Sequence, residues 1–216
     1  MFWKKKKTCE ETAAFWASDQ GAEQGFVDDL RNVVAEADCA ALVVCHFQQT
    51  KERVVGVLES EGLAVTVSTT LAEVMGGREA STRSGGPVVV VAYELVQRLA
   101  GAMPEEHRKG NAVVFMPEVY PTLSRDEALH AFALGWVSTA TIQKYVSLAS
   151  PLMQSIGNEG LTAVLQQLGM GEGERLEHAM LAGALRNVQK KIGKRVDREQ
   201  SAASQQQWLD VNLQKR

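Results

Sequence analysis

The chain has 216 residues, 45% of them hydrophobic, which is enough for the core of one large domain or of a smaller domain with appendages. Its net charge of −3 hides basic ends: residues 1–7 carry +4 and residues 186–216 carry +5, which leaves −12 for the body between them. No apolar run approaches the ~20 residues of a membrane span, no cleavable signal pattern appears, and an acidic body does not suit nucleic acid, which needs clustered cations.

Residues 1–38 are predicted to form a basic tip followed by a helix. Within AEQGFVDDLRNVVAEA, apolar residues recur at intervals of three and four, as on one face of a helix. Cys9, Cys39 and Cys45 lack the spacing of a metal site and indicate reduced thiols, as in a cytoplasmic protein.

Residues 39–148 are predicted to form an α/β domain. Runs of apolar and β-branched residues alternate with segments of helical period. The predicted strands are 40–47, 63–69, 87–93 and 111–117, and the predicted helices are 49–62, 70–77 (ending in two glycines) and 94–103. This alternation predicts a parallel sheet with helices on its faces.

The pattern changes after Pro117. Ser124 followed by Glu127 resembles a capping box and predicts a helix over 124–136. The alternating segment 141–148 is predicted to be an edge strand, and residues 149–216 are predicted to be a helical extension that includes a long C-terminal helix.

A glycine cluster precedes that last helix, which starts near Leu176. Gly169, Gly171 and Gly173 invite comparison with a phosphate-binding loop, but the Lys-Ser/Thr pair of such a loop is missing. Two glutamates between and after the glycines would repel a phosphate, so the cluster is interpreted as a turn with acidic residues at a helix start.

From about residue 143 to residue 191 the chain resembles the second motor domain of SecA, the preprotein-translocase ATPase, running into its helical scaffold. The segments KYVSLASPLMQSIG, LGMGEGERLEH and ALRNVQKKIGKR follow one another with the spacing of that family. The shared residues are Leu168, Gly169, Met170, Gly173, Glu174, Glu177, His178, Asn187, Gln189 and Lys190. The resemblance implies a RecA-like (P-loop-NTPase-type) parallel sheet over residues 39–148.

Upstream the resemblance lies in the architecture alone. The family's glycine-arginine-aspartate motif is absent from residues 87–103, and Ser124, Arg125 and Asp126 echo the first half of a motif whose later paired arginines are missing. The first motor domain, with its Walker lysine and metal-binding carboxylates, has no counterpart here. Because loss of an arginine finger alone costs about 10³–10⁵ in rate, the resemblance implies a degenerate, non-catalytic lobe without a cofactor.

One candidate nucleotide contact follows the first predicted strand of the α/β domain. Ligands of doubly wound sheets bind beyond strand C-termini, which selects His46, Thr50 and Lys51 as an inherited, vestigial contact. A capped helix start is the alternative.

Other candidate residues belong to interaction surfaces or to simple packing. In the scaffold helix these are Glu177, His178, Gln189, Lys190 and Lys194. Glu177 and His178 are neighbours and point about 100° apart on a helix, so a helix cap is favoured over an acid–base pair. His107 and His130 have no second ligand at metal spacing, and no metal site is predicted.

The N-terminal tip combines interfacial aromatic residues with lysines: Phe2, Trp3, Lys4, Lys5, Lys6 and Lys7. Such a tip suits an anionic membrane surface at about 1 kcal/mol per lysine, and an ordinary solvated terminus is the alternative.

These observations lead to three hypotheses. The first is a cytoplasmic, non-catalytic SecA-like adaptor whose protein partner is a motor lobe, the translocation channel or a client polypeptide. The second is one lobe of a split ATPase, which would bind ATP with a partner's Walker loop and depend on Arg78, Arg83 or Arg125. The third is a protein held at the inner face of the membrane by its tip.

Overall fold

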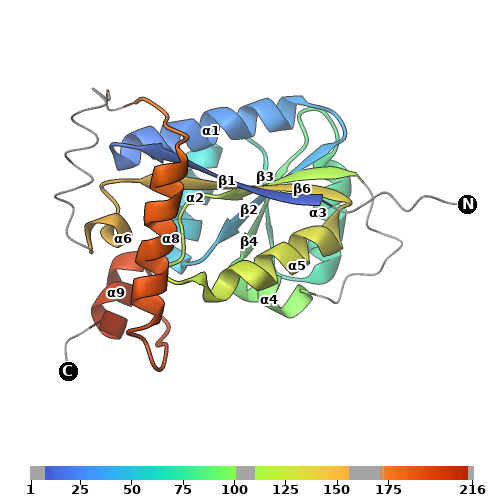
Figure 1. The fold of residues 1–216 in the computed structure, drawn as a ribbon. Helices are drawn as coiled ribbons and strands as arrows, with labels where there is room; N and C mark the ends of the chain where they lie inside the picture. The colour runs from blue at the N-terminus through green and yellow to red at the C-terminus, as the bar shows by residue number, and fades with distance from the viewer. Residues whose placement is uncertain (1–7, 101–109, 156–170, 172, 214–216) are drawn as a thin grey trace, which may run out of the picture.

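The computed structural model describes residues 8–100, 110–155, 171 and 173–213. Within them lies a parallel sheet of six strands in the order β1-β6-β5-β2-β4-β3. The strands are β1 (Thr8–Trp16), β2 (Cys39–Cys45), β3 (Val65–Ser68), β4 (Val88–Ala92), β5 (Asn111–Met116) and β6 (Thr139–Ser147). Figure 1 shows the sheet between layers of helices.

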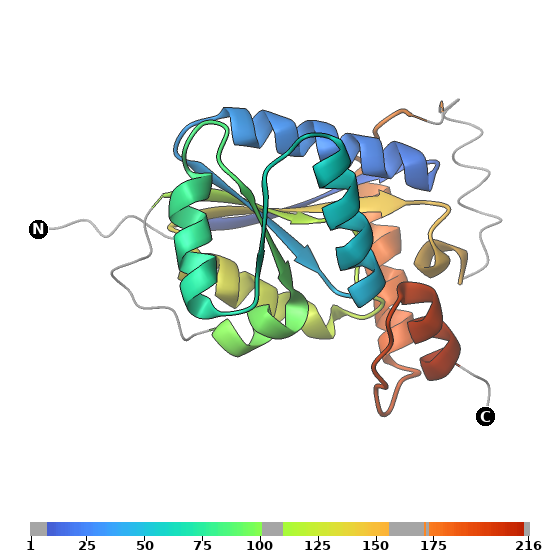
Figure 2. The same cartoon turned by 180° about the vertical axis from the view of Figure 1, so that it is seen from behind.

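Helices cover both faces of the sheet. Helices α1 (Asp19–Ala35) and α2 (Gln48–Ser60) pack on one face. Helices α3 (Leu71–Ser81), α4 (Tyr93–Leu99) and α5 (Asp126–Trp136) pack on the other, and Figure 2 shows α2 and α3 from behind. The α/β prediction, with its parallel sheet and flanking helices, is confirmed, and this is the architecture that a RecA-like domain requires.

The strands at the centre of the sheet are buried on both faces, as their composition predicts. β2 and β4 consist almost entirely of valine, alanine and leucine with exposed fractions near zero. Continuous apolar runs are typical of parallel strands covered by helices on both sides. The apolar clusters on the two faces of the sheet therefore share these central strands.

Strand β1 corrects the helical prediction for the first forty residues. Residues 8–16 pair in parallel with β6 along their whole length, and Ala14, Phe15 and Trp16 are buried. The segment TCEETAAFW mixes strand-forming threonine and aromatic residues with alanine and glutamate and shows no period-two alternation, so its strand depends on long-range pairing with β6. Residues 8–35 thus belong to the same sheet and core as the α/β domain.

Strand β6 is an interior strand, which corrects the edge assignment. It lies between β1 and β5. Its polar side chains find partners on neighbouring elements: Lys144 contacts Glu11 of β1, and Gln143 donates to Asp29 of α1 at 2.8 Å. The alternation that indicates a solvent-facing edge here comes from internal polar contacts.

Two predicted helix boundaries also change. Helix α3 runs on through Gly77 to Ser81, and Gly77 lies so close to β4 that a Cβ there would stand 2.9 Å from a methyl group of Val89. The capping box of α5 does not form: Ser124 lies in a short 3₁₀ turn (η2, Leu123–Arg125) and bonds Thr122, so α5 starts at Asp126.

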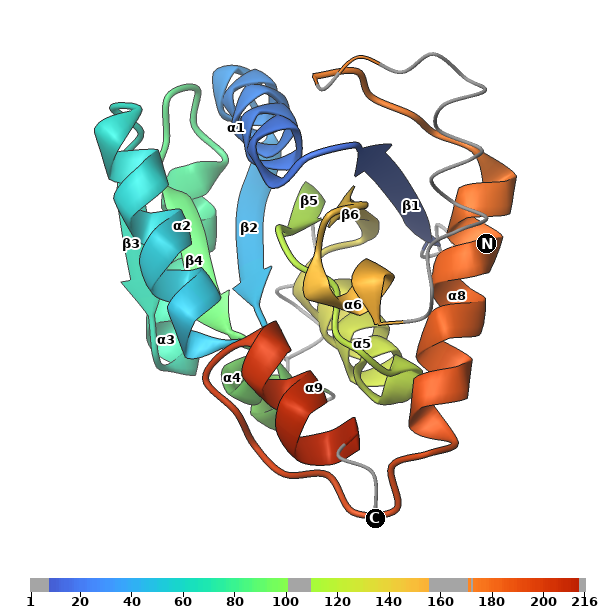
Figure 3. The same ribbon diagram turned by 90° about the vertical axis from the view of Figure 1, so that its left-hand side faces the viewer.

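The C-terminal extension packs across the end of the sheet as separate helices. These are α6 (Pro151–Gln154), α8 (Ala179–Gly193) and α9 (Gln205–Leu213). The long C-terminal helix therefore ends at Gly193, and a non-helical segment separates it from α9. Figure 3 looks at this end of the molecule, with α6 and α9 in front and α8 beside the sheet. Residues 156–170 and 172 of the predicted helical extension lie outside the described residues, and the division into domains stays a prediction.

Candidate functional site

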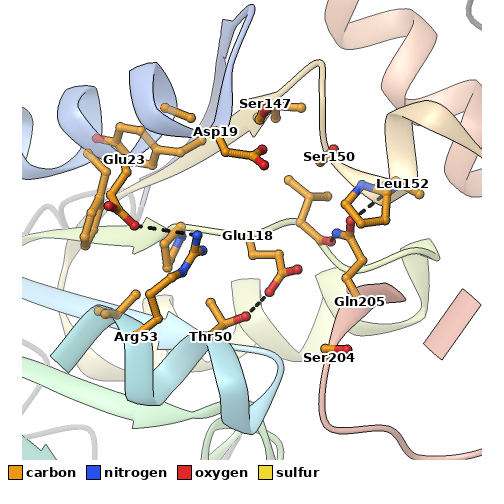
Figure 4. Close-up of a pocket in the computed structure, with 18 of the residues that line it drawn as sticks. Asp19, Glu23, Thr50, Arg53, Glu118, Ser147, Ser150, Leu152, Ser204 and Gln205 are labelled. Atoms are coloured by element: carbon orange, nitrogen blue, oxygen red, sulfur yellow. Dashed lines mark hydrogen bonds and ion pairs between the residues drawn. The ribbon is translucent and has the colours of Figure 1, made fainter. Parts of the chain in front are cut away.

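A crevice opens where the direction of winding changes. From β2 the chain crosses by α2 toward β3, and from the neighbouring β5 it crosses by α5 on the opposite face toward β6. The loop after β2 and the loop after β5 therefore leave the sheet toward opposite faces. Doubly wound sheets bind ligands at such a place, beyond the carboxyl ends of the two strands. A pocket of about 350 Å³ lies there, and Figure 4 shows its lining.

The lining of the pocket combines apolar and polar side chains. Phe26, Tyr145 and Leu152 are among the buried apolar residues of its lining. The ionisable and polar side chains of its lining include Asp19, Glu23, Thr50, Arg53, Glu118, Ser147, Ser150, Ser204 and Gln205. They come from the starts of α1, α2 and α9 and from the segments that follow β5 and β6.

Carboxylates dominate the charge of this pocket. Its ionisable lining residues are Asp19, Glu23, Glu118 and Arg53, so the lining is net negative. Arg53 is paired with Glu23 at 3.6 Å. The hydroxyl of Thr50 donates to Glu118, yet burial raises the pKa of Glu118, and the nearby charge of Asp19 adds to that rise.

The start of α9 forms one wall of the pocket and is held there by hydrogen bonds. The side chain of Gln205 donates to Val119 O at 2.7 Å and accepts from Leu152 N at 2.9 Å. Gln49 N donates to Ala203 O at 3.0 Å. The C-terminal segment is thereby tied to the loops after β2, β5 and β6.

Beside the pocket, Arg125 is enclosed by aromatic rings. Its guanidinium carbon stands 3.8 Å from the ring centre of Tyr120 and 4.5 Å from that of Tyr93, a cation–π geometry. Glu94 and Glu199 lie 3.8 and 3.7 Å from its terminal nitrogens. Burial lowers the pKa of Arg125, an effect that Glu94 and Tyr93 partly offset.

The three predicted nucleotide contacts are not brought together. Thr50 lines the pocket, whereas Lys51 is half-buried and is not part of the lining. The rings of Tyr93 and Tyr120 that enclose Arg125 are called here the aromatic cage. His46 lies against both of them, with ring centres 5.1 Å apart, and its Nδ1 has no hydrogen-bond partner. A nucleotide contact through these residues stays a prediction.

Sequence reasoning missed the acidic side of the pocket. Glu118 directly follows Pro117, the residue at which the β5 strand prediction ends, and a carboxylate at a strand C-terminus was the available signal. Asp19 and Glu23 gave no such signal, because the strand before them was predicted to be helical.

The arginines of the split-ATPase hypothesis do not line the pocket. Arg78 donates to Trp136 O at 3.0 Å, and exposed Arg83 lies just before β4, at the opposite end of the sheet. Arg125 is held in its cage. The six residues of the membrane tip and His107 lie outside the described residues, so those predictions are not tested.

The predicted interaction residues divide into buried and exposed groups. His178 caps α8 by accepting from Met180 N at 3.2 Å, as the cap interpretation requires, and Glu177 pairs with Arg175. Gln189 is 2% exposed and donates to Tyr120 O at 2.8 Å, so it is a packing residue and not part of a surface. Lys190 and Lys194 are exposed.

The exposed face of α8 and the turn after it is basic. Leu181, Leu185 and Ile192 face the core. The exposed basic side chains are Arg186, Lys190, Lys191, Lys194, Arg195 and Arg198, called here the α8 basic face. None of them forms a salt bridge among the described residues.

In the described part of the chain, no three His, Cys, Asp or Glu side chains come close enough to hold a metal ion. No helix among the described residues has the length and hydropathy to cross a bilayer.

We expect the buried imidazole of His46 to make the fold sensitive to acid. Burial, with Arg125 and Lys144 adding to it, holds the pKa of His46 well below its ordinary 6.5. Below pH 6.5 the unfolded chain binds a proton that the folded chain rejects, so stability falls as pH falls, by up to about 1.4 kcal/mol per pH unit. Urea unfolding at pH 7 and pH 5 should show that His46→Phe loses less stability on acidification than wild type.

The matched control is His178→Asn, which removes an exposed histidine and keeps a good helix cap. Between pH 7 and pH 5 this variant should lose as much stability as wild type, because the carboxylates contribute equally in all three chains. Equal losses in wild type and His46→Phe would contradict the assignment of this sensitivity to His46.

Comparison with known proteins gives local similarity to SecA. Protein translocase subunit SecA of Lachnoclostridium phytofermentans is 46% identical over 48 residues, and that of Acidithiobacillus ferrooxidans is 40% identical over 55 residues. SecA of Alkaliphilus oremlandii is 27% identical over 103 residues, which is 46% of this chain. These matches relate part of the chain to the protein translocation motor.

The similarity is limited in extent. The chain covers 6 to 12% of the length of these relatives, and no family model matches it. Among solved structures, the C-terminal part of the Fun30 ATPase domain aligns with 77% of this chain and 54% of that one, at a TM-score of 0.41 and 12% identity. That likeness is weak, and the fold is defined by the strand order itself.

Proposed function

We propose that the chain is a non-catalytic relative of the second SecA motor lobe that works as a protein-interaction module. The observation that carries the proposal is the carboxylate-lined crevice. The position where a doubly wound sheet receives phosphates holds Asp19, Glu23 and Glu118 against Arg53, and Arg53 is already paired. A triphosphate there would face net repulsion, because its own charge has the same sign.

The state of Arg125 supports the same conclusion. A motor lobe of this kind contributes arginines that neutralise charge on the transferred phosphate. Here the guanidinium is sandwiched by Tyr93 and Tyr120 and flanked by carboxylates. Moving it to a ligand would give up those contacts and leave Glu199 without its cation.

The α8 basic face is the proposed contact surface. Its cations are exposed and unpaired among the described residues, while the body of the chain is acidic. A basic face on an otherwise acidic protein orients its encounter with a partner and favours a partner with an acidic surface. The partner proposed is a component of the translocation machinery, on the basis of the local SecA similarity, and the compartment proposed is the cytoplasm.

One experiment with two readouts tests this function. Purified full-length chain is assayed for phosphate release from ATP, and, when immobilised, for retention of the translocation motor and channel of its own organism. We expect no turnover above buffer and retention that the double variant Lys190→Glu/Lys194→Glu weakens at least about tenfold, because it reverses two cations at the contact.

The matched control is Arg83→Glu/Arg98→Glu, which changes the net charge equally at exposed positions away from α8. It should bind like wild type. Turnover at an ordinary rate of about 1 s⁻¹ or more would refute the non-catalytic role. Absent retention, or equal loss in both double variants, would refute the interaction role.

A further inference from the structure

The crevice disfavours ATP, but its volume and its lining favour a ligand of another kind. Its volume of about 350 Å³ falls within the range of small-molecule pockets. Part of its lining is apolar and includes Phe26 and Tyr145, which pack edge to face at 5.4 Å. The same lining contains carboxylates and hydroxyl groups. A ligand that fits this mixture has an apolar body and one polar, charged end.

The charge of that end follows from the pairing of the lining residues. Arg53 and Glu23 neutralise each other at 3.6 Å. Neither Asp19 nor Glu118 forms a salt bridge among the described residues. Figure 4 shows both side chains in the lining of the pocket, with Asp19 on the α1 side and the Glu118 carboxylate turned toward Thr50. Burial raises the pKa of Glu118 and the charge of Asp19 adds a smaller rise, while the Thr50 hydroxyl and the charge of Arg53 oppose it. A cation between Asp19 and Glu118 would relieve their repulsion.

The geometry favours an organic cation over a metal ion. A metal site needs several ligand atoms converging at about 2.0–2.6 Å, and the described carboxylates do not converge in that way. An ammonium or guanidinium group accepts wider spacing, because its hydrogens point in several directions. The side chain of Ser147, a buried residue of the lining, adds a neutral hydroxyl acceptor.

We propose that the crevice at the carboxyl ends of β2 and β5 binds an ammonium or guanidinium group carried on an apolar body. The cation lies between Asp19 and Glu118, and the apolar part rests on Phe26 and Tyr145. The group comes either from a free amine or from a lysine or arginine side chain of a peptide. This site is independent of the α8 basic face and uses the same crevice that the proposed function denies to ATP.

The test is calorimetric titration of the full chain with probes of defined charge. Agmatine and cadaverine represent free amines, and acetyl-Ala-Leu-Lys-Leu-Ala-amide represents a basic side chain. ADP and inorganic phosphate are the anionic probes. We expect at least one cationic probe to bind at low salt and neither anion to bind. Tighter binding of the peptide identifies a side chain as the source, and tighter binding of an amine identifies a small molecule.

Variants locate the binding. Glu118→Gln keeps an acceptor for the Thr50 hydroxyl and removes the charge, so affinity should fall at least about tenfold, as it should for Asp19→Asn. Glu59→Gln changes the net charge equally on the exposed far end of α2 and should bind like wild type. Circular dichroism of each variant confirms that it is folded before titration.

Three results would overturn the site: no heat with any cationic probe up to about 10 mM, equal binding by wild type and both crevice variants, or binding of ADP that Arg53→Gln abolishes. The first two leave the proposed function standing. The third overturns the proposed function as well, so the two failures are distinguishable.

Discussion

Replacing Lys144 by methionine should lower the free energy of unfolding by about 3 kcal/mol at neutral pH. Its side chain is 5% exposed and its ammonium group donates to Glu11 at 2.8 Å and to Asp126 at 3.4 Å. His130 contacts the same Glu11 at 2.8 Å. Methionine keeps the volume but leaves two carboxylates facing each other, and removing one partner of a buried pair costs roughly 3–5 kcal/mol. The partly exposed carboxylates set the expectation at the lower end.

The two carboxylates respond differently to this lysine. Burial acts to raise the pKa of Glu11, but the charge and hydrogen bond of Lys144, with help from His130, lower it overall. For Asp126, burial raises the pKa, and the neighbouring Glu11 adds to the rise, while the more distant Lys144 opposes it. The lysine therefore stabilises Glu11 more than Asp126.

This difference gives the prediction a pH dependence. Because the folded-state pKa of Glu11 is depressed, its contribution to stability is present above about pH 4.5 and is lost as pH falls through the folded value. Without Lys144 the two half-buried carboxylates face each other without the lysine's charge, so protonating them helps the folded state. The penalty of Lys144→Met should be largest near pH 7 and shrink toward pH 4.

Urea unfolding of a double-mutant cycle measures the effect. Lys144→Met combined with Asp126→Asn should recover part of the loss, since one stranded charge is gone. The control Lys191→Met removes an exposed lysine and should change stability by less than about 0.5 kcal/mol. A cost for Lys144→Met no larger than for Lys191→Met would show that the buried ion cluster does not stabilise the fold.

The central strands were predictable because their composition and burial agree. The central stretches of these strands, ALVV and VVVV, have no polar side chain that needs a partner, so the pattern determines both strand and location. Strands β1 and β6 at one side of the sheet were harder. Lys144 is a buried charge that depends on Glu11, 133 positions away, and on Asp126 at the start of α5, and no local pattern encodes such a pairing.

The site was predictable in position but not in chemistry. The rule that ligands bind beyond strand C-termini selected the loop after β2 and hence Thr50. It did not identify Gln205, which is about 150 positions away and closes the pocket by bonds to Val119 and Leu152. His46 was selected by its place in the chain, but its ring turns into the aromatic cage, a choice that packing with Tyr93 and Tyr120 determines.

Trp208→Ala should have the other large effect, a loss of about 3–5 kcal/mol in the free energy of unfolding. The indole is fully buried. It meets Tyr120 edge to face at 5.6 Å and donates to Glu199 at 3.3 Å. Glu199 also accepts from Tyr120 and flanks Arg125. The one side chain therefore anchors α9 to the aromatic cage.

The structural consequence should be local before it is global. Without the indole, the C-terminal segment keeps the packing of Leu209 and hydrogen bonds such as those of Gln205, and it loses its largest apolar contact, so α9 should open while the sheet stays folded. Amide hydrogen exchange should accelerate over residues 199–213 and remain slow in β2 and β4. Trp208→Phe keeps most of the packing and loses the bond to Glu199, so it should fall between wild type and alanine. If exchange over residues 199–213 is unchanged in Trp208→Ala, the indole does not hold this segment, and the wall that α9 forms along the crevice depends on the packing of Leu209 and on hydrogen bonds.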